Sequence, residues 1–145
     1  MNRQPLRVLF LCTGNSCRSQ MAEGLVNAAF AGRIQAFSAG TDPHGLNPLA
    51  VQVMAELGID ISGHSSDHIS RYEGQRFDYV ISLCGDANEK CPLFFGGVKR
   101  LHLGFPDPPK ASGSPEEVLA VYRQVRNAIR STLQELFERE LAKVP

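Results

Sequence analysis

The sequence Val-Leu-Phe-Leu-Cys-Thr-Gly-Asn-Ser-Cys-Arg-Ser, residues 8–19, joins a short apolar run to a loop that carries a thiol and a guanidinium. The run at residues 8–11 predicts a buried strand, and the residues from Arg18 onward predict a helix. A loop of this length curls so that successive backbone N–H groups point inward, which makes a nest for a tetrahedral oxyanion. The start of the helix adds its own N–H groups and its positive end. This stretch therefore predicts a strand–loop–helix unit with an anion site in the loop.

Two side chains give the predicted anion site its chemistry. Arg18 carries a planar guanidinium that matches two oxygens of the anion and closes the ring of donors. Cys12 lies beneath the anion, where positive surroundings favour the nucleophilic thiolate. We therefore expect a thiolate aimed at a phosphate-shaped substrate. The residues expected to bind that substrate are Thr13, Gly14, Asn15, Ser16, Cys17, Arg18 and Ser19.

Two residues of the loop have more than one interpretation. Ser19 can donate a hydrogen bond to the Cys12 thiolate, and an ordinary serine at the start of a helix is the alternative. Cys17 lies where the chain enters the helix and is expected to point inward. We therefore interpret the Cys17 thiol as structural.

The composition predicts one soluble globular domain that spans residues 1–145. Of the 145 residues, 43% are hydrophobic and 21% are charged, so the chain can bury a core of its own. Fifteen basic and fifteen acidic side chains cancel, which argues against nucleic acid or an anionic membrane as the partner. The early apolar run is too short for a signal peptide core or a membrane span. We therefore expect a cytoplasmic protein.

The chain has four cysteines, at positions 12, 17, 84 and 91. Their spacings, Cys-x4-Cys and Cys-x6-Cys, differ from the Cys-x2-Cys pairs of common structural zinc sites, so catalytic thiol chemistry is favoured over zinc. Polar residues between Cys84 and Cys91 predict a surface loop or frayed helix with two exposed thiols. Together with Cys12, these thiols suggest a relay by thiol–disulfide exchange.

Four apolar runs predict strands at residues 8–11, 34–38, 79–83 and 98–103. Helical patterns predict four helices. The first follows the loop and ends at Gly32, and the second runs from Asn47 as N-cap to Gly58. A short third helix begins near Ser66 or Asp67, and the last extends from the Ser114–Glu117 capping box to Leu136. Strands that are apolar on both faces and alternate with helices predict a parallel sheet covered on both sides. The expected fold is therefore α/β, with three layers and a four-stranded parallel sheet.

In such a sheet the carboxyl ends of the strands meet at one edge, where ligands bind. Cys12 follows the first predicted strand, Cys84 follows the third, and Asp107 follows the fourth. Prolines around Asp107 make a stiff loop that can hold its carboxyl over the anion as a general acid. A solvated turn aspartate is the alternative, since such residues are common before proline. With Cys12 and Arg18 at the same edge, we favour the acid.

Other polar residues carry weaker signals. His64 and His68 stand four residues apart, but no glutamate follows the first as metallohydrolases require, so we interpret both as surface or capping histidines. Oxygen-bearing side chains occur in four separate segments, and their spacing alone does not say whether they meet. These residues are Asn15, Glu23, Ser38 and Asp67.

Residues 12–24, Cys-Thr-Gly-Asn-Ser-Cys-Arg-Ser-Gln-Met-Ala-Glu-Gly, resemble the low-molecular-weight tyrosine phosphatases. They are more similar still to the thioredoxin-coupled arsenate reductases built on that phosphatase fold. The resemblance continues at Ser38-Ala39-Gly40, at residues 64–67, at residues 83–92 and at Asp107-Pro108. It implies a single three-layer α/β/α domain whose four-stranded parallel sheet has a flavodoxin-like winding.

The resemblance also implies roles for individual residues. Cys12 would be the nucleophile, Arg18 and the loop amides would bind the oxyanion, and Asp107 would be the acid. Cys84 and Cys91 would be the second and third redox cysteines, with thioredoxin as the electron donor. The substrate would be arsenate, with phosphate or sulfate as competing oxyanions, and the protein would be a cytoplasmic monomer without an organic cofactor. A potassium ion near the loop would have ligands at Asn15, Glu23, Ser38 and Asp67.

Departures from the phosphatase pattern favour the reductase. The phosphatases usually have aromatic residues after Asp-Pro, where this chain has Pro109 and Lys110, and they usually have proline where this chain has Gln20. The reductases coupled to glutathione and glutaredoxin place their later cysteines closer together than Cys84 and Cys91. Two alternatives stay open. One is a phosphatase for small aryl phosphates or phosphotyrosine, an activity that can also accompany the reductase as a weak side reaction. The other is a non-catalytic redox or zinc-binding module.

Overall fold

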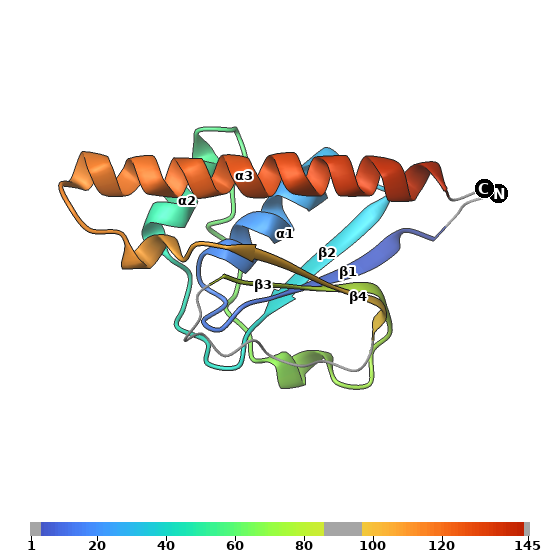
Figure 1. Ribbon diagram of the computed structural model, residues 1–145. Helices are drawn as coiled ribbons and strands as arrows, with labels where there is room; N and C mark the ends of the chain where they lie inside the picture. Colours follow the sequence, from blue (N-terminus) through green and yellow to red (C-terminus); the bar gives the residue numbers. More distant parts are fainter. Residues whose placement is uncertain (1–3, 86–96, 144–145) are drawn as a thin grey trace.

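The computed structural model describes residues 4–85 and 97–143. Within this part of the chain, four parallel strands form one sheet in the order β2-β1-β3-β4 (Figure 1). The strands are β1 (Leu6–Leu11), β2 (Ile34–Ala39), β3 (Phe77–Cys84) and β4 (Gly97–Phe105). Each of the four predicted apolar runs lies in one of them. The prediction of a parallel α/β sheet with flavodoxin-like winding is therefore confirmed.

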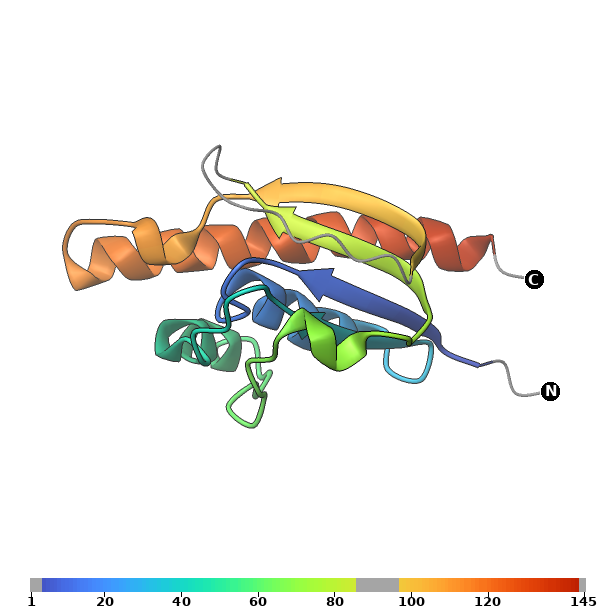
Figure 2. The ribbon, with the colours of Figure 1, turned by 90° about the horizontal axis from the view of Figure 1, so that it is seen from below.

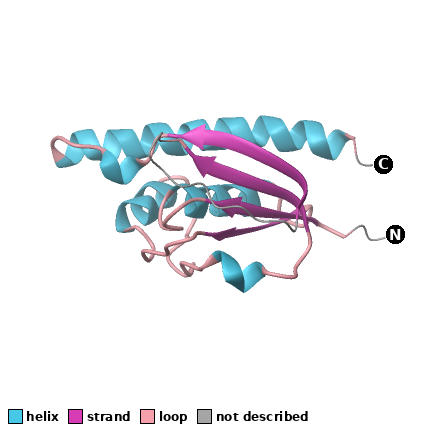
Figure 3. Ribbon diagram, turned by 60° about the horizontal axis from the view of Figure 1, so that its bottom comes forward, coloured by secondary structure: helices cyan, strands magenta, loops and turns pink. Residues whose placement is uncertain are grey.

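The α-helices of the described residues pack together on one face of the sheet (Figures 1 and 3). They are α1 (Arg18–Ala29), α2 (Pro48–Ala55) and α3 (Pro115–Ala142). The local start signals act as predicted. The side chain of Asn47 accepts hydrogen bonds from the first N–H groups of α2, and Ser114 and Glu117 form a capping box at the start of α3.

Side chains of β1 alternate between the two faces of the sheet and fill two apolar clusters. Val8 and Phe10 pack with the three α-helices, whereas Leu9 and Leu11 belong to a smaller cluster on the opposite face. That cluster includes Tyr72 of η1, a 3-10 helix at Ile69–Tyr72 that lies in front of the sheet in Figure 2. Both faces of the sheet are therefore covered, as predicted.

The short helix expected to begin at Ser66 or Asp67 begins instead at Ile69. Hydrogen bonds from the carboxyl end of β2 explain the difference. Gly40 donates its N–H to Asp67 O and accepts from the N–H of Ile69, both at 2.9 Å, so this segment continues the sheet as an isolated bridge. The main chain turns into η1 only after this bridge, with His68 as the N-cap.

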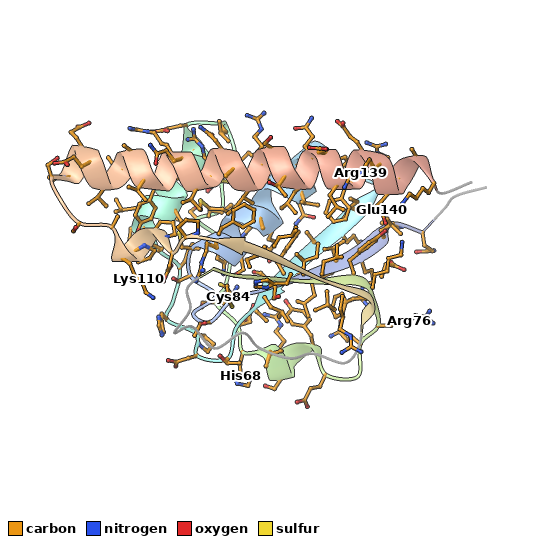
Figure 4. All side chains as sticks on the ribbon, in the orientation of Figure 1. His68, Arg76, Cys84, Lys110, Arg139 and Glu140 are labelled. Atoms are coloured by element: carbon orange, nitrogen blue, oxygen red, sulfur yellow. The ribbon has the colours of Figure 1, made fainter. Side chains whose placement is uncertain are left out.

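The carboxyl ends of β1, β3 and β4 bring the predicted reactive residues to one edge. Cys12 directly follows β1, Cys84 is the last residue of β3, and Asp107 follows β4 by two residues. In Figure 4, Cys84 and Lys110 lie toward the end of the molecule where α3 begins, whereas Glu140 lies toward the end where α3 finishes. Among the helices of residues 4–85 and 97–143, none is long and apolar enough to span a membrane.

A charged clamp joins the end of α2 to α3 behind this edge. The guanidinium of Arg123 donates to both carboxylate oxygens of Glu56 at 2.8–3.0 Å. The guanidinium of Arg126 donates to Glu56 Oε1 and to Val53 O, both at 2.8 Å. Hydrogen bonds from Arg123 and then Arg126 lower the pKa of Glu56 to about 2. Glu56 is therefore more acidic in the folded chain than its ordinary value of 4.5.

We predict that Glu56→Gln lowers the midpoint of thermal unfolding at pH 7 by about 2–4 °C. Because folding lowers the pKa of Glu56, its contribution to stability is fully present above pH 4.5 and is lost as the pH falls toward about 2. The difference between wild type and variant should therefore narrow between pH 5 and pH 3 in differential scanning calorimetry. Glu138→Gln, at an exposed position of α3 outside the clamp, is the control. An equal shift at all pH values would contradict this account.

Candidate active site

The loop between β1 and α1 is held from outside by a neighbouring segment, residues 41–47. The backbone N–H groups of Asp42, His44 and Asn47 donate to the carbonyl oxygens of Thr13, Gly14 and Ser16 at 2.9, 2.9 and 3.0 Å. In a trans peptide the C=O and the following N–H point in opposite directions. The N–H groups that follow these three carbonyls therefore face the inside of the loop, as an oxyanion nest requires.

Asn15 adopts a left-handed conformation in this loop, with φ = 44°. This conformation is costly for residues other than glycine, although asparagine tolerates it better than most. Side chains offset the cost. Asn15 Oδ1 accepts from the N–H of Asp67 at 2.7 Å, and its carbonyl oxygen accepts from Ser66 Oγ at 2.8 Å and from Gln20 Nε2 at 3.0 Å. The loop is thus supported on its second side by residues 65–67.

Gly40 lies directly behind the loop. A Cβ at this position would overlap the carbonyl oxygens of Cys12 and Thr13. The N–H of Cys12 also donates to Ala39 O at 3.2 Å, which extends the pairing of β1 with β2 to Cys12. The Ser38-Ala39-Gly40 motif therefore has a steric reason: only glycine lets β2 end this close to the loop.

Cys12 is 2% exposed, and its Sγ lies 2.9 Å from Ser19 Oγ. Ser19 Oγ in turn accepts from Asn15 Nδ2 at 2.8 Å, so its own proton can be donated to the sulfur. This geometry favours the functional interpretation of Ser19 over an ordinary serine at a helix start. Cys17 is buried as predicted, and burial, followed by the charge of Asp107, raises the pKa of its thiol. Cys17 therefore stays protonated, which agrees with a structural role.

Arg18 is buried and connects the loop to the ends of two strands. Its Nη1 donates to Leu83 O at 3.3 Å and to Phe105 O at 3.1 Å. Its Nη2 lies 3.6 Å from Asp107 Oδ1. The structure thus brings Arg18 and Asp107 together at the carboxyl edge of the sheet, as the sequence predicted.

The expectation of an exposed thiol at Cys84 is wrong. Cys84 is 3% exposed and pairs with Phe105 of β4, after a register shift between Ser82 and Cys84. The chain stays in the sheet up to this residue, and at Gly85 a Cβ would overlap the backbone of Phe105. The polar residues that suggested a surface loop begin only after Cys84. Cys91 lies outside the described residues.

An open cleft of about 960 Å³ lies in front of the loop. The loop forms its floor, residues 41–48 form one wall, and residues 107–110 form another. Pro109 and Lys110, which stand where the phosphatases usually have aromatic residues, line this cleft. Cys12, Arg18 and Asp107 therefore open onto a space much larger than a tetrahedral oxyanion.

The four candidate potassium ligands form two contacting pairs beside the loop. Ser38 Oγ donates to Glu23 Oε1 at 2.8 Å, and the Asp67 N–H donates to Asn15 Oδ1. Burial, and next to it the charge of Asp67, raises the pKa of Glu23 to about 7. The Asp67 carboxylate pairs with Arg71 at 2.8 Å. The described residues contain no group of three or more His, Cys, Asp or Glu side chains arranged to hold a metal ion.

The two histidines of the sequence pattern differ from each other. His68 is the exposed capping residue that was predicted, since its ring nitrogen accepts from Ser70 N. His64 is partly exposed and makes further contacts, because its Nδ1 lies 3.1 Å from Glu23 Oε2 and 3.0 Å from Gln20 Oε1. Burial lowers the pKa of His64. Its neighbours come from α1, which the local sequence around residue 64 does not reveal.

Sequence reasoning also missed residues that support the loop from other segments. The Nε2 of Gln20 also donates to Ser65 O at 2.9 Å, a contact that the departure from the phosphatase pattern at this position does not predict. The helix pattern predicts Asn47 only as an N-cap, but its N–H also donates to Ser16 O and its Nδ2 donates to Tyr122 Oη at 3.1 Å. The sequence shows only that both residues are polar, and their places in a helix and at an N-cap already account for a polar side chain.

Comparison with known proteins agrees with this geometry. Residues 7–144 match the model of the family described as low molecular weight phosphotyrosine protein phosphatase. An arsenate reductase of Bacillus subtilis is 49% identical over 131 residues, which cover 90% of this chain and 94% of that protein. A solved arsenate reductase in the phosphate binding state superposes with a TM-score of 0.79 at 36% identity, covering 92% of this chain and 98% of that one.

A low molecular weight protein tyrosine phosphatase from T. tengcongensis has the same fold, with a TM-score of 0.70 and 27% identity over 92% of this chain and 99% of that one. The family match extends over nearly the whole chain and includes the loop, Arg18 and Asp107. The chain therefore belongs to the low molecular weight phosphotyrosine protein phosphatase family.

Proposed function

We propose that this protein reduces arsenate to arsenite, with Cys12 as the nucleophile. The observation that carries the proposal is a pair of buried thiols at one edge of the sheet. Cys12 lies in an anion-binding loop, and Cys84 ends the adjacent strand, since β1 pairs directly with β3. Relatives named arsenate reductase, at 41–49% identity, support the same reaction. We further propose that the enzyme acts as a cytoplasmic monomer.

In the first step the Cys12 thiolate attacks the arsenic of arsenate. A sulfur–arsenic bond forms and an arsenic–oxygen bond breaks, which leaves As(V) bound to sulfur. Asp107 supplies a proton to the leaving oxygen, which departs as water. The inward N–H groups of the loop and the Arg18 guanidinium hold the remaining oxygens.

In the second step the Cys84 thiolate attacks Cys12 Sγ. A disulfide forms, the electron pair of the sulfur–arsenic bond moves to arsenic, and As(V) becomes As(III), which leaves as arsenite. Phosphorus(V) and sulfur(VI) do not accept the electron pair in this way and are not reduced at this site. Phosphate and sulfate therefore bind in the loop as competitors and stay unreduced.

The third step restores Cys12. The Cys91 thiolate attacks Cys84 Sγ, which releases the Cys12 thiolate and leaves a Cys84–Cys91 disulfide for the dithiol of thioredoxin to reduce. The burial of Cys84 supports this step, because a sulfur in a residue that is 3% exposed is poorly accessible to a second protein. A further thiol is then needed to carry the oxidation to the surface.

A phosphatase side activity follows from the same first step. Attack of Cys12 on a phosphate ester, with Asp107 as the acid, needs neither Cys84 nor Cys91. The cleft in front of the loop has room for a small aryl group, but Pro109 and Lys110 in its wall offer no aromatic rings to sandwich one. We therefore propose that this activity is weak.

We also propose that potassium binds beside the loop, with oxygen ligands from Asn15, Glu23, Ser38 and Asp67. Two observations support a cation there: neutral oxygens of Ser38 and Asn15 lie beside Glu23 and Asp67, and burial disfavours the negative charge of Glu23 and raises its pKa to about 7. A bound cation would supply the positive charge that keeps Glu23 ionised. Through Asn15, these residues support the left-handed turn of the loop.

The three cysteines should fail at different stages when each is changed to serine. Cys12→Ser should lose arsenate reduction and phosphatase activity, because both need the first displacement. Cys84→Ser should lose reduction and keep the phosphatase activity. Cys91→Ser should complete about one turnover and stop as a Cys12–Cys84 disulfide. The measurements are arsenate-dependent NADPH oxidation with thioredoxin and its reductase, hydrolysis of p-nitrophenyl phosphate, and mass spectrometry of the stalled protein. Sustained turnover by Cys91→Ser would disprove the relay.

Asp107→Asn should slow the first displacement by about 10²–10⁴-fold while phosphate binding persists, since only the proton donor is lost. Rapid-quench measurement of arsenite formed in a single turnover gives the rate, and calorimetric titration with phosphate gives the affinity. Asp60→Asn, an exposed position remote from the cleft, is the control. An unchanged single-turnover rate would return Asp107 to the role of a turn residue.

Glu23→Gln should remove any response of arsenate reduction to potassium, because the substituted side chain keeps the hydrogen bond to Ser38 but loses the charge that attracts the cation. Initial rates in potassium chloride and in choline chloride at equal ionic strength give the response. Glu73→Gln, an exposed position outside these residues, is the control. A potassium response that survives in Glu23→Gln would exclude Glu23 as a ligand.

A further inference from the structure

We infer that His44, oriented by Asp42, takes up a proton when the loop binds a tetrahedral dianion and thereby favours dianions over monoanions. The inference rests on the anion-binding loop of the proposed function. Both residues line the cleft in front of that loop. The sequence pattern assigns neither of them a role.

The main chain fixes the position of His44 against the loop. The N–H of His44 donates to Gly14 O and the N–H of Asp42 donates to Thr13 O, both at 2.9 Å. These are two of the bonds that turn the loop carbonyls outward. The residue that carries the imidazole is therefore anchored on the peptide units that bind the anion.

The imidazole ring lies on Gly14. A Cβ at Gly14 would stand 2.9 Å from His44 Nδ1 and 3.3 Å from Cγ, so any larger residue would displace the ring. His44 Nε2 lies 3.1 Å from Asp42 Oδ2. The ring is thus held at one nitrogen by a carboxylate, while the other nitrogen faces the loop. In the imidazolium form both nitrogens carry protons, one toward Asp42 and one toward the loop.

Among the described residues that line the cleft, His44 is the histidine, and several charged groups surround it. Asp42 faces the ring from its own segment, Cys12 and Arg18 lie in and beside the loop, and Asp107 and Lys110 lie on the opposite wall. Arg18 faces Asp107, so these two charges largely offset each other. A dianion adds two negative charges beside an imidazole, the side chain that titrates near neutral pH. Nearby negative charge favours the protonated form of that imidazole.

The exposure of the pair sets the size of the effect. The side chains of His44 and Asp42 are 59% and 78% exposed. A proton can therefore reach the ring from solvent, and an exposed ion pair of this kind contributes little to folding. One unit charge near the loop in such surroundings should change the affinity for a dianion by about three- to tenfold.

Sulfate tests the inference, because it is a tetrahedral dianion that does not itself titrate between pH 5.5 and pH 9. Calorimetric titrations of the reduced protein in buffers of different ionisation enthalpy give the number of protons taken up per sulfate. The same titrations in a Cys12→Ser background remove the contribution of that thiol. We expect proton uptake in both proteins between pH 6 and pH 7.5.

His44→Gln should lose most of this uptake and bind sulfate about three- to tenfold more weakly at pH 6.5. At pH 9, where an imidazole carries no charge, the affinities of wild type and His44→Gln for sulfate should agree. Asp42→Asn should move the uptake to lower pH without removing the ring, and His68→Gln, at an exposed histidine that caps η1, should behave as wild type. Proton NMR titration of the four histidines with and without sulfate should show the His44 midpoint rising in sulfate.

Equal proton uptake in wild type and His44→Gln, with sulfate still bound by both, would overturn the inference and leave the proposed reductase intact. A His44 NMR midpoint that sulfate does not move would overturn it in the same way. Failure of the wild type to bind any tetrahedral anion would contradict the proposed function itself, and this inference with it.

Discussion

The outward orientation of three carbonyl groups is the constraint on which the site depends. Backbone N–H groups of Asp42, His44 and Asn47 hold the carbonyls of the loop between β1 and α1. A peptide unit that rotated by half a turn would present an oxygen to the anion in place of an N–H, and the nest would repel its ligand. The loop sequence supplies the thiol and the guanidinium, but the segment at residues 41–47 decides which way the peptides face.

The loop has a second support that differs in chemistry from the first. On the side of residues 41–47 the contacts are made by the main chain, whereas on the side of residues 65–67 they pass through the side chains of Asn15, Gln20 and Ser66. Side-chain contacts can carry charge, and on this side lies Glu23, a half-buried carboxyl whose pKa is raised by burial. A cation on this side and a protonated His44 on the other would therefore act on the same loop through separate contacts.

Local spacing explains what could be predicted and what could not. The four strands, the three α-helices and the strand–loop–helix unit at Cys12 follow from patterns that a few neighbouring residues determine, and the parallel sheet then places Asp107 and Cys84 at the same edge. The burial of Cys84 depends on how far β3 continues beside β4, which its polar neighbours conceal. The contacts of His64 and His44 depend on which distant loop packs against α1 or the anion site. Such contacts belong to tertiary packing, and a single sequence carries no local signal for them.

Arg18 links the loop between β1 and α1 to the strand that ends in Cys84. One guanidinium faces Asp107 and donates to Leu83 O, the carbonyl directly before Cys84. In the proposed reaction, the group that neutralises the anion therefore also holds the main chain from which the second sulfur would attack. Since arsenate and phosphate have nearly the same shape and charge, the loop alone discriminates poorly between them. In the reaction that we propose, the discrimination comes after the first displacement, when the Cys84 thiolate attacks Cys12 Sγ and the atom bound to that sulfur accepts two electrons. A shared support for both sulfurs would keep these two steps within one site.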